Sequence, residues 1–385
     1  MIKTADRIAQ TKEYYFSKKL KEVNRLKEKG KPIINLGIGS PDIQPPKEVI
    51  NSLVKATKDD SAHQYQPYAG INELRQAIHH FYKTHYDVSL HVDDEIMPLM
   101  GSKEGIMHIS MAFVNPGNEV FVPNPGYPTY SAVTRLMQAK PVGYDLKEAN
   151  NWQPDFEQLE KRVTDQTKLM WLNYPHMPTG ANADNKTIQS LIAFAEKHNI
   201  LLVNDNPYSL ILTDEAFSLL KYATENTQLL ELNSLSKSFN MAGWRIGMLC
   251  GNSNLIQSIV QVKTNMDSGM FYPIQKGAAT ALGSSINWIQ ELNQEYKQRR
   301  ELIWKLCDQL NLSYDERASG MFVWARINKD IGEEVLSDLL LHDYHMFVTP
   351  GSVFGRQGSG YLRFSLCVNQ SEIQECIQRI KVVSL

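Results

Sequence analysis

The chain has 385 residues, of which 42% are hydrophobic and 21% are charged, and its formal net charge is -2. This length leaves room for two or three domains with a large apolar core. The near-neutral charge gives no electrostatic reason to expect a nucleic acid or an anionic membrane as a partner. No run of about 18 apolar residues predicts a membrane span.

The cysteines show neither a disulfide framework nor a C-x-x-C metal motif; they are Cys250, Cys307, Cys367 and Cys376. Such spacing is typical of buried thiols in a reducing compartment. The first residues, Met-Ile-Lys-Thr-Ala-Asp-Arg, lack the apolar run of a signal peptide. We therefore expect a globular protein of the cytoplasm.

The first predicted element is an amphipathic helix over residues 11–29 that ends at Gly30. From residue 95 onward, short apolar runs alternate with longer stretches of helical periodicity. The expected strands are Ile96–Met100, Val120–Val122, Leu169–Leu172, Ile200–Val203, Leu229–Leu232 and Ile246–Leu249, and helices are expected at 103–113, 186–198 and 251–265. This alternation predicts an α/β fold with a mostly parallel sheet sandwiched by helices, which binds ligands at the carboxyl ends of its strands.

Toward the end of the chain, the predicted helices and strands differ in length and order from those before residue 286. A long helix without proline or glycine is expected over 286–310. Shorter elements follow it, namely strands at Met321–Ile327, Met346–Val348 and Tyr361–Leu366 and helices at 331–341 and 371–381. We therefore predict a large domain over 48–285 and a smaller α+β domain formed by 1–47 together with 286–385.

One stretch carries the chemistry around which the rest is organised. Lys237 follows the hydroxyl residues Ser234 and Ser236, and Arg245 comes eight positions later between two glycines. Such an amine can form an imine with an aldehyde, and hydroxyls with a guanidinium can bind a phosphate dianion. The alternative is a serine-rich loop with a solvated lysine. The stretch closely resembles the cofactor-lysine segment of fold-type I pyridoxal-phosphate enzymes, in particular the class I and II aminotransferases of the aspartate aminotransferase superfamily.

The same resemblance implies cofactor contacts at other strand ends, in the large domain. Ser102 and the backbone amide of Lys103 open a predicted helix, where free amides and the helix dipole favour an anion. The family holds the cofactor phosphate there, and a plain helix cap is the alternative. Tyr127, in a proline-rich loop, matches the ring that stacks on the pyridine. Asp205 matches the carboxylate that keeps the ring nitrogen protonated, and Tyr208 matches a donor to the ring oxygen.

Two residues are expected to bind the carboxylate of the substrate. Gly39, two positions after Gly37, resembles the family's substrate arm rather than a dinucleotide fingerprint, because Pro41 follows instead of a helix. Arg363 lies inside an apolar strand and matches the family's bidentate clamp, with a structural ion pair as the alternative. Tyr65 matches a tyrosine that reaches the cofactor phosphate of a partner subunit, so the resemblance implies a homodimer.

The loop from Asn173 to Gly180 departs from the family pattern at one position. Met177 stands where the family has an asparagine that donates a hydrogen bond to the ring oxygen of the cofactor. The spacing of the loop is unchanged, so Tyr208 is left as the main side-chain donor. The neighbouring His176 is expected to be solvated, and the alternative is a ring that turns inward and donates in place of the missing asparagine.

Together these residues predict a pyridoxal-phosphate-dependent aminotransferase that moves an amino group between an α-amino acid and a 2-oxo acid. Lys237 is expected to hold the cofactor and to move a proton as general base and acid, and no metal ion is expected to take part. A carbon–sulfur β-lyase or a carbon–carbon synthase is the alternative that the same cofactor pocket allows. A non-enzymatic binding or regulatory module is the alternative of another class.

The sequence leaves the identity of the substrate open. The side-chain pocket is expected to be lined by Tyr14, Phe16, Gly320, Met321 and Phe322. Such residues favour apolar contacts. The segment 263–271 resembles one found in LL-diaminopimelate-type and related aminotransferases.

Overall fold

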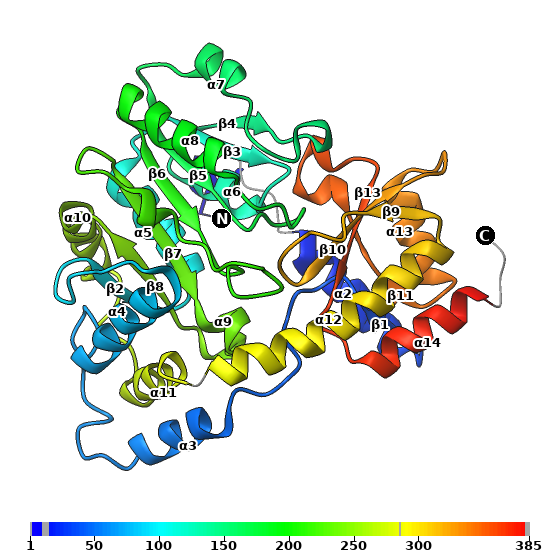
Figure 1. The fold of residues 1–385 in the computed structure, drawn as a ribbon, viewed down its shortest axis with the longest axis horizontal. Coiled ribbons are helices and arrows are strands. Elements are labelled where there is room, and N and C mark those ends of the chain that lie inside the picture. The colour runs from blue at the N-terminus through cyan, green and yellow to red at the C-terminus, as the bar shows by residue number, and fades with distance from the viewer. Residues whose placement is uncertain (1, 10–14, 285, 382–385) are drawn as a thin grey trace.

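The structure is a computed structural model that describes residues 2–9, 15–284 and 286–381 (Figure 1). Its strands are β1 (Ile34–Asn35), β2 (Ile96–Leu99), β3 (Glu119–Asn124), β4 (Lys140–Asp145), β5 (Thr167–Leu172), β6 (Leu201–Asp205), β7 (Leu229–Ser234), β8 (Gly247–Gly251), β9 (Leu312–Tyr314), β10 (Phe322–Ile327), β11 (Met346–Phe347), β12 (Thr349–Pro350) and β13 (Tyr361–Ser365).

The α-helices are α1 (Asp6–Ala9), α2 (Tyr15–Glu28), α3 (Lys47–Ala56), α4 (Asn72–Tyr86), α5 (Ser102–Phe113), α6 (Pro128–Leu136), α7 (Phe156–Arg162), α8 (Asn185–His198), α9 (Leu235–Ser238), α10 (Ser253–Lys263), α11 (Tyr272–Leu282), α12 (Ile286–Gln309), α13 (Glu333–His342) and α14 (Gln370–Lys381). Among the described residues, no helix combines the length and the apolar character that crossing a membrane requires.

The larger sheet has seven strands in the order β2-β8-β7-β6-β5-β3-β4. Neighbouring strands from β7 through β4 pair in parallel, whereas β8 runs antiparallel to both β2 and β7. The expectation of a mostly parallel sheet is confirmed. The edge strand β4 was not expected, because Pro141 and Gly143 interrupt its apolar run and most of its side chains are only half-buried.

Helices cover both faces of this sheet, and the side chains of the central strand β5 show how. Leu169 and Trp171 pack on one face against apolar side chains of α5, α6 and α10. Met170 and Leu172 point to the opposite face and pack against α8. Because both faces are buried, the strand is a continuous apolar run rather than an alternating one. This is the pattern from which the strand was predicted.

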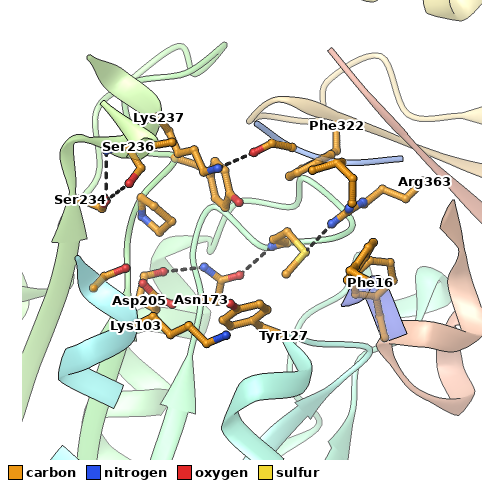
Figure 2. A pocket seen from close by; sticks show the side chains of 18 of the residues that line it. Phe16, Lys103, Tyr127, Asn173, Asp205, Ser234, Ser236, Lys237, Phe322 and Arg363 are labelled. Carbon is orange, nitrogen blue, oxygen red and sulfur yellow. Dashed lines mark hydrogen bonds between the residues drawn. The ribbon is translucent and has the colours of Figure 1, made fainter. Parts of the chain in front are cut away.

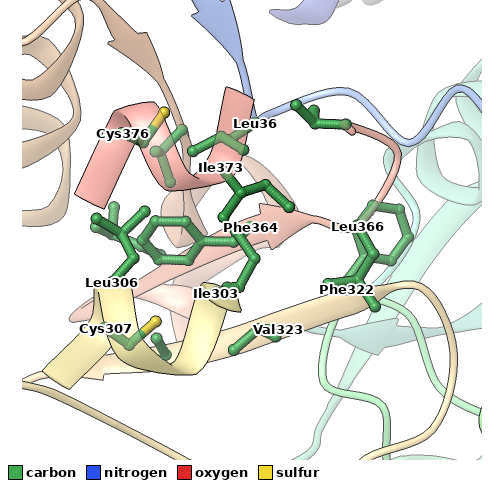
Figure 3. Close-up of a cluster of buried hydrophobic side chains, with 14 of the residues drawn as sticks. Leu36, Ile303, Leu306, Cys307, Phe322, Val323, Phe364, Leu366, Ile373 and Cys376 are labelled. Atoms are coloured by element: carbon green, nitrogen blue, oxygen red, sulfur yellow. The ribbon is translucent and has the colours of Figure 1, made fainter. Parts of the chain in front are cut away.

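A second region is built on a four-stranded antiparallel sheet with the order β12-β13-β10-β9. Figure 3 shows its core, in which Leu306 of α12, Phe364 of β13 and Ile373 of α14 point toward one another. The N-terminal strand β1 pairs in parallel with β11, so the two ends of the chain share this region. The predicted division into two domains stays a prediction, and its boundary at Ser285 lies outside the described residues.

The long helix α12 runs between the two regions (Figure 1). Its residue Arg299 contacts one segment near the start of the sequence and another near its end. Its guanidinium donates to the two carboxylate oxygens of Asp42 at 2.6 and 3.0 Å and to the carbonyl of Leu366 at 3.0 Å. Glu295, one turn earlier on the helix, accepts a further bond at 2.7 Å. Asp42 lies shortly after Gly39, and Leu366 directly follows β13, so this contact fixes both segments relative to the helix.

Candidate active site

A cavity of about 440 Å³ lies at the carboxyl edge of the seven-stranded sheet, where the second region faces it (Figure 2). All the predicted site residues except Tyr65 line it, namely Gly39, Ser102, Lys103, Tyr127, Asp205, Tyr208, Ser234, Ser236, Lys237, Arg245 and Arg363. Most follow the carboxyl end of a strand. Arg245 instead precedes β8, and because β8 is antiparallel, its amino end lies at this same edge.

Lys237 lies on α9, a single helical turn that begins directly after β7. Ser234 caps this turn, since its hydroxyl accepts a hydrogen bond from the amide of Ser236 at 3.1 Å. The half-buried Lys237 donates from Nζ to the carbonyl of Gly39 at 2.5 Å, across the cavity. Burial lowers the pKa of Lys237, and the nearby cations Arg363 and Arg245 lower it further. A lysine amine with a lowered pKa is more often neutral and thus able to act as nucleophile and base.

One corner of the cavity is built for an anion. The helix α5 starts there with Ser102, and Gly101 is its N-terminal cap residue. The alternative that Ser102 serves only as the helix cap is therefore wrong. Gly101 has a φ of 84°, and a side chain there would collide with the guanidinium of Arg245. A Cβ at Gly247 would lie 2.7 Å from the amide nitrogen of Ser102. These glycines let a cation and the start of a helix come together, as binding of a phosphate requires.

Asp205 ends β6 and is held by Tyr130 of α6 and by Asn173, which directly follows β5. Its Oδ2 accepts a hydrogen bond from the hydroxyl of Tyr130 at 2.8 Å, and its backbone carbonyl accepts one from Asn173 at 2.5 Å. Its Oδ1 is buried without a hydrogen-bond partner among the described residues. Burial raises the pKa of Asp205 to about 6, although the bond from Tyr130 opposes this. The open acceptor calls for a donor inside the cavity.

Two tyrosines border the same space. Tyr127 lies edge-on to Tyr130, with ring centroids 5.5 Å apart, and half-buried. Tyr208 is buried, and burial raises the pKa of its hydroxyl well above the usual range. The Tyr208 hydroxyl therefore stays protonated and can donate a hydrogen bond. Neither Tyr130 nor Asn173 was predicted as a site residue, because their contacts with Asp205 depend on strands being neighbours in space.

Arg363 lies in β13, and its guanidinium is surrounded by aromatic rings. Its Cζ is 4.0 Å from the ring centroid of Phe322, 4.6 Å from that of Phe354 and 5.4 Å from that of Phe16. One nitrogen donates to the carbonyl of Gly37 at 2.7 Å. Cation–π contacts of this kind fix a guanidinium without neutralising its charge. The arginine can therefore still bind a carboxylate in the cavity.

The loop after β5 differs from expectation at His176. This histidine is buried, and its ring is hydrogen-bonded to the Thr179 hydroxyl at 2.8 Å and the Pro125 carbonyl at 3.1 Å. Burial lowers its pKa to about 3, so the ring is neutral. The prediction of a solvated histidine is wrong, because a second proline-rich loop covers it. Met177 does line the cavity, and its sulfur lies 3.3 Å from a guanidinium nitrogen of Arg363.

The side-chain pocket was predicted only in part. Phe16 and Phe322 line the cavity. Met321 does not, because it is fully buried in the core of the second region, where its sulfur lies 3.6 Å from that of Cys367. Gly320 also lies outside the lining, and Tyr14 falls outside the described residues. Leu20, Ile38 and Phe354, which were not predicted, complete the apolar part of the wall.

Comparison with known proteins identifies the family. A family model described as Aminotransferase class I and II matches residues 31–380. The chain is 36% identical to the LL-diaminopimelate aminotransferase of Halothermothrix orenii, over 99% of this chain and 98% of that protein. The chain belongs to the class I and II aminotransferases. It is a pyridoxal-phosphate-dependent enzyme that moves an amino group between an α-amino acid and a 2-oxo acid.

Two solved structures share the whole fold of this chain. The substrate-bound structure of BacF from Bacillus subtilis superposes with a TM-score of 0.95 at 34% identity, covering 100% of this chain and 98% of that one. An alanine aminotransferase from Pyrococcus furiosus superposes with a TM-score of 0.91 at 27% identity, covering 99% and 100%. The predicted fold-type I architecture is therefore confirmed.

The aminotransferase has a site whose shape fits pyridoxal phosphate. The buried open oxygen of Asp205 suits the protonated nitrogen of a pyridine ring. The glycine-lined corner beside Arg245 suits the phosphate. Lys237 lies in the same cavity, with a lowered pKa that suits attack on the aldehyde. These residues therefore fit the ring nitrogen, the phosphate and the aldehyde of pyridoxal phosphate.

Tyr65 of the aminotransferase lies apart from the cavity of its own chain. Its side chain is 90% exposed, and the assignment of Tyr65 to a partner subunit stays a prediction. The backbone that directly follows Tyr65 packs on Gly269, where an added Cβ would collide with the carbonyl of Gln66.

A buried cluster of charges lies behind the phosphate corner. Glu104, His108 and Asp267 offer ligand atoms within 4.8 Å of one another. The ammonium of Lys263 lies among them, 3.3 Å from Glu104 and 2.5 Å from Asp267. The ammonium of Lys263 thus occupies the position that a metal ion bound by these three residues would take. The second oxygen of Glu104 accepts the amide hydrogen of Met100, so the cluster also supports the turn that leads into α5.

Proposed function

We propose that Lys237 binds the aldehyde of the cofactor and afterwards carries the proton that transamination moves. The observation that carries the proposal is the position of this amine in one cavity with the open oxygen of Asp205 and the guanidinium of Arg363. Its pKa is lowered first by burial and then by two arginines, which favours the neutral form of the amine. The proposal combines nucleophile and general base in one side chain.

The remaining residues divide into a cofactor side and a substrate side. We assign the phosphate to Ser102, the Lys103 amide, Ser234, Ser236 and Arg245, which meet at the corner beside the start of α5. We assign the ring to three further residues. Asp205 pairs with the ring nitrogen, Tyr127 stacks on the ring face, and Tyr208 donates to the ring oxygen.

On the substrate side, Arg363 binds the α-carboxylate through two parallel hydrogen bonds, with Gly39 close by. Pyridoxal phosphate, when bound, supplies a carbonyl that condenses with amines and a ring that accepts the electron pair of the broken Cα–H bond. Asp205 favours that acceptance because its negative charge keeps the ring nitrogen protonated. Arg363 orients the Cα–H bond, and Lys237 removes the proton and returns it.

We also propose that the active enzyme is a homodimer in which Tyr65 contacts the phosphate of the partner's cofactor. Its exposed ring supports this assignment. The division into a large cofactor-binding domain over 48–285 and a small domain over 1–47 and 286–385 belongs to the same proposal. Its support is the separation of the two sheets along the chain. A location in the cytoplasm remains a prediction from the sequence.

Replacement of Lys237 by alanine tests the central assignment. We expect Lys237→Ala to lose both amino transfer and the borohydride-reducible attachment of the cofactor, while its circular dichroism stays that of the parent. Lys83→Ala is the matched control, since Lys83 lies on the surface in an ion pair with Asp87. Reducible attachment at another lysine in Lys237→Ala would refute the proposal. Parallel assays of oxo-acid-dependent amino transfer and of pyruvate and ammonia release distinguish the transferase from a β-lyase.

A further inference from the structure

The wall of the cavity around Arg363 is apolar. Figure 2 shows Phe16, Phe322 and Arg363 together on one side, away from Ser234 and Asp205 on the other. The three phenylalanine rings nearest the guanidinium are supplemented by two aliphatic side chains, Leu20 and Ile38. The α-carbon of an amino acid carries both its carboxylate and its side chain. A substrate bound to Arg363 can therefore place its side chain against this wall.

Nearly all charged side chains of the cavity already have a role in the proposed function. Among its described lining residues, the charged ones are Lys103, Asp205, Lys237, Arg245 and Arg363. The proposed function assigns all but Lys103 to the cofactor or the α-carboxylate through their side chains, and Lys103 lies at the phosphate corner. Within that lining, the sole carboxylate is Asp205, on the side opposite the apolar wall. A second ammonium on a substrate would thus meet no counter-charge from the described lining.

We propose that the amino substrate of this enzyme carries a bulky, uncharged apolar side chain, aromatic or branched aliphatic. This inference rests on the proposed function and extends it to the choice of substrate. It separates this chain from the relatives named LL-diaminopimelate aminotransferases. The far end of diaminopimelate carries an ammonium and a carboxylate, which both need partners when they leave water. The wall formed by Leu20, Ile38, Phe16, Phe322 and Phe354 offers them ring faces and methyl groups.

Physical costs set the size of the expected preference. An apolar side chain gains free energy by leaving water and contacting these residues. An ammonium or carboxylate that is buried without a partner loses far more. We expect kcat/KM to be on the order of 100-fold or more higher for L-phenylalanine or L-leucine than for LL-diaminopimelate, L-lysine or L-glutamate.

The test uses the purified holoenzyme and follows the absorbance of the bound cofactor after each amino donor is added. Leu20 lines the apolar wall and has no assigned role toward the cofactor or the α-carboxylate. Leu20→Glu should lower kcat/KM for phenylalanine by about 10- to 100-fold and raise it for lysine, because it adds a counter-charge. Leu20→Met should keep the parent preference. Leu20→Gln, which matches glutamate in size, should lose activity toward phenylalanine without gaining any toward lysine.

The outcomes separate this inference from the function on which it rests. Faster reaction with phenylalanine or leucine, together with the shift in Leu20→Glu, supports the proposal. Faster reaction with diaminopimelate, lysine or glutamate overturns the choice of substrate and leaves the aminotransferase assignment intact. An unchanged preference in a folded Leu20→Glu would also overturn it, because the side chain would then not face this wall. Failure of every donor to react would refute the proposed function and this inference with it.

Discussion

Lys263 provides a direct test of how much the charge cluster behind the phosphate corner stabilises the fold. Its side chain is 1% exposed, and its ammonium lies 3.3 Å from Glu104 and 2.5 Å from Asp267. Replacement by methionine keeps most of the aliphatic chain but leaves the two carboxylates without this cation. Removing one member of a buried ion pair costs about 3–5 kcal/mol. Because Glu104 keeps His108 and both carboxylates touch water, we expect Lys263→Met to lose about 2–4 kcal/mol of unfolding free energy.

The assay is urea unfolding of the holoenzyme followed by tryptophan fluorescence, at one protein concentration and one cofactor concentration. Lys276→Met is the matched control, since its ammonium lies 3.5 Å from Glu73 and the two side chains are 31% and 55% exposed. An exposed pair of this kind contributes less than about 1 kcal/mol. In the double variant, Asp267→Asn should restore part of the loss caused by Lys263→Met. Equal losses from Lys263→Met and Lys276→Met would refute the reasoning.

The same cluster predicts a dependence on pH. Burial alone would raise the pKa of Glu104, but the hydrogen bond from His108, the charge of Lys263 and the amide of Met100 together lower it to about 2. A carboxyl with a lowered pKa stabilises the fold above its ordinary value of 4.5, and this contribution is lost as the pH falls toward 2. The difference between the parent and Lys263→Met should therefore be full at neutral pH and shrink below about pH 4.5.

Three further changes test the site itself. Burial raises the pKa of Asp205 to about 6, so the cofactor-free protein should lose stability as the pH rises through that value. Asp205→Asn should abolish that loss and raise the unfolding free energy of the cofactor-free form by about 3 kcal/mol at pH 8, as urea unfolding would measure. The same variant should bind the cofactor more weakly in a cofactor titration. An unchanged unfolding free energy would contradict this reasoning. Tyr65→Phe should weaken cofactor retention by roughly 1–2 kcal/mol, and sedimentation that reveals a fully active monomer would exclude the shared site. Met177→Asn adds a donor to the ring oxygen, so the midpoint of the bound cofactor's absorbance titration should fall by about one pH unit; equal midpoints would place residue 177 away from that oxygen.

The strand ends of the larger sheet could be predicted because each is marked by a local pattern in the sequence. A buried apolar run followed by a polar residue marks the end of a strand, and the parallel arrangement brings such ends to one edge. Asp205 at the end of β6 and Lys237 after β7 were found in this way, together with the resemblance of their motifs to a family. Arg245 precedes its strand rather than follows it, and only the antiparallel course of β8 explains its place at the edge.

The residues that were missed depend on contacts between distant segments. Tyr130 and Asn173 reach Asp205 only because β3, β5 and β6 are neighbours in the sheet. His176 is buried because the loop after β3 covers it, and the carbonyl of Pro125 in that loop accepts a hydrogen bond from Nε2 of its ring at 3.1 Å. No local pattern in the chain encodes such neighbours. A single sequence therefore predicts which elements exist better than which side chains they cover.

The joining of the two chain ends in the second region has a consequence for how the protein is made. Arg363 and its acceptor Gly37 are 326 positions apart in the sequence. A ribosome adds about 5–20 residues per second, so the first segment emerges roughly 15–65 s before its partner. During that interval the apolar side chains of Ile33, Ile34 and Leu36 have no strand β11 or β13 to pack against. The residues of the seven-stranded sheet are translated before β13, so the substrate side of the active site is completed only after the segment that carries Arg363 has left the ribosome.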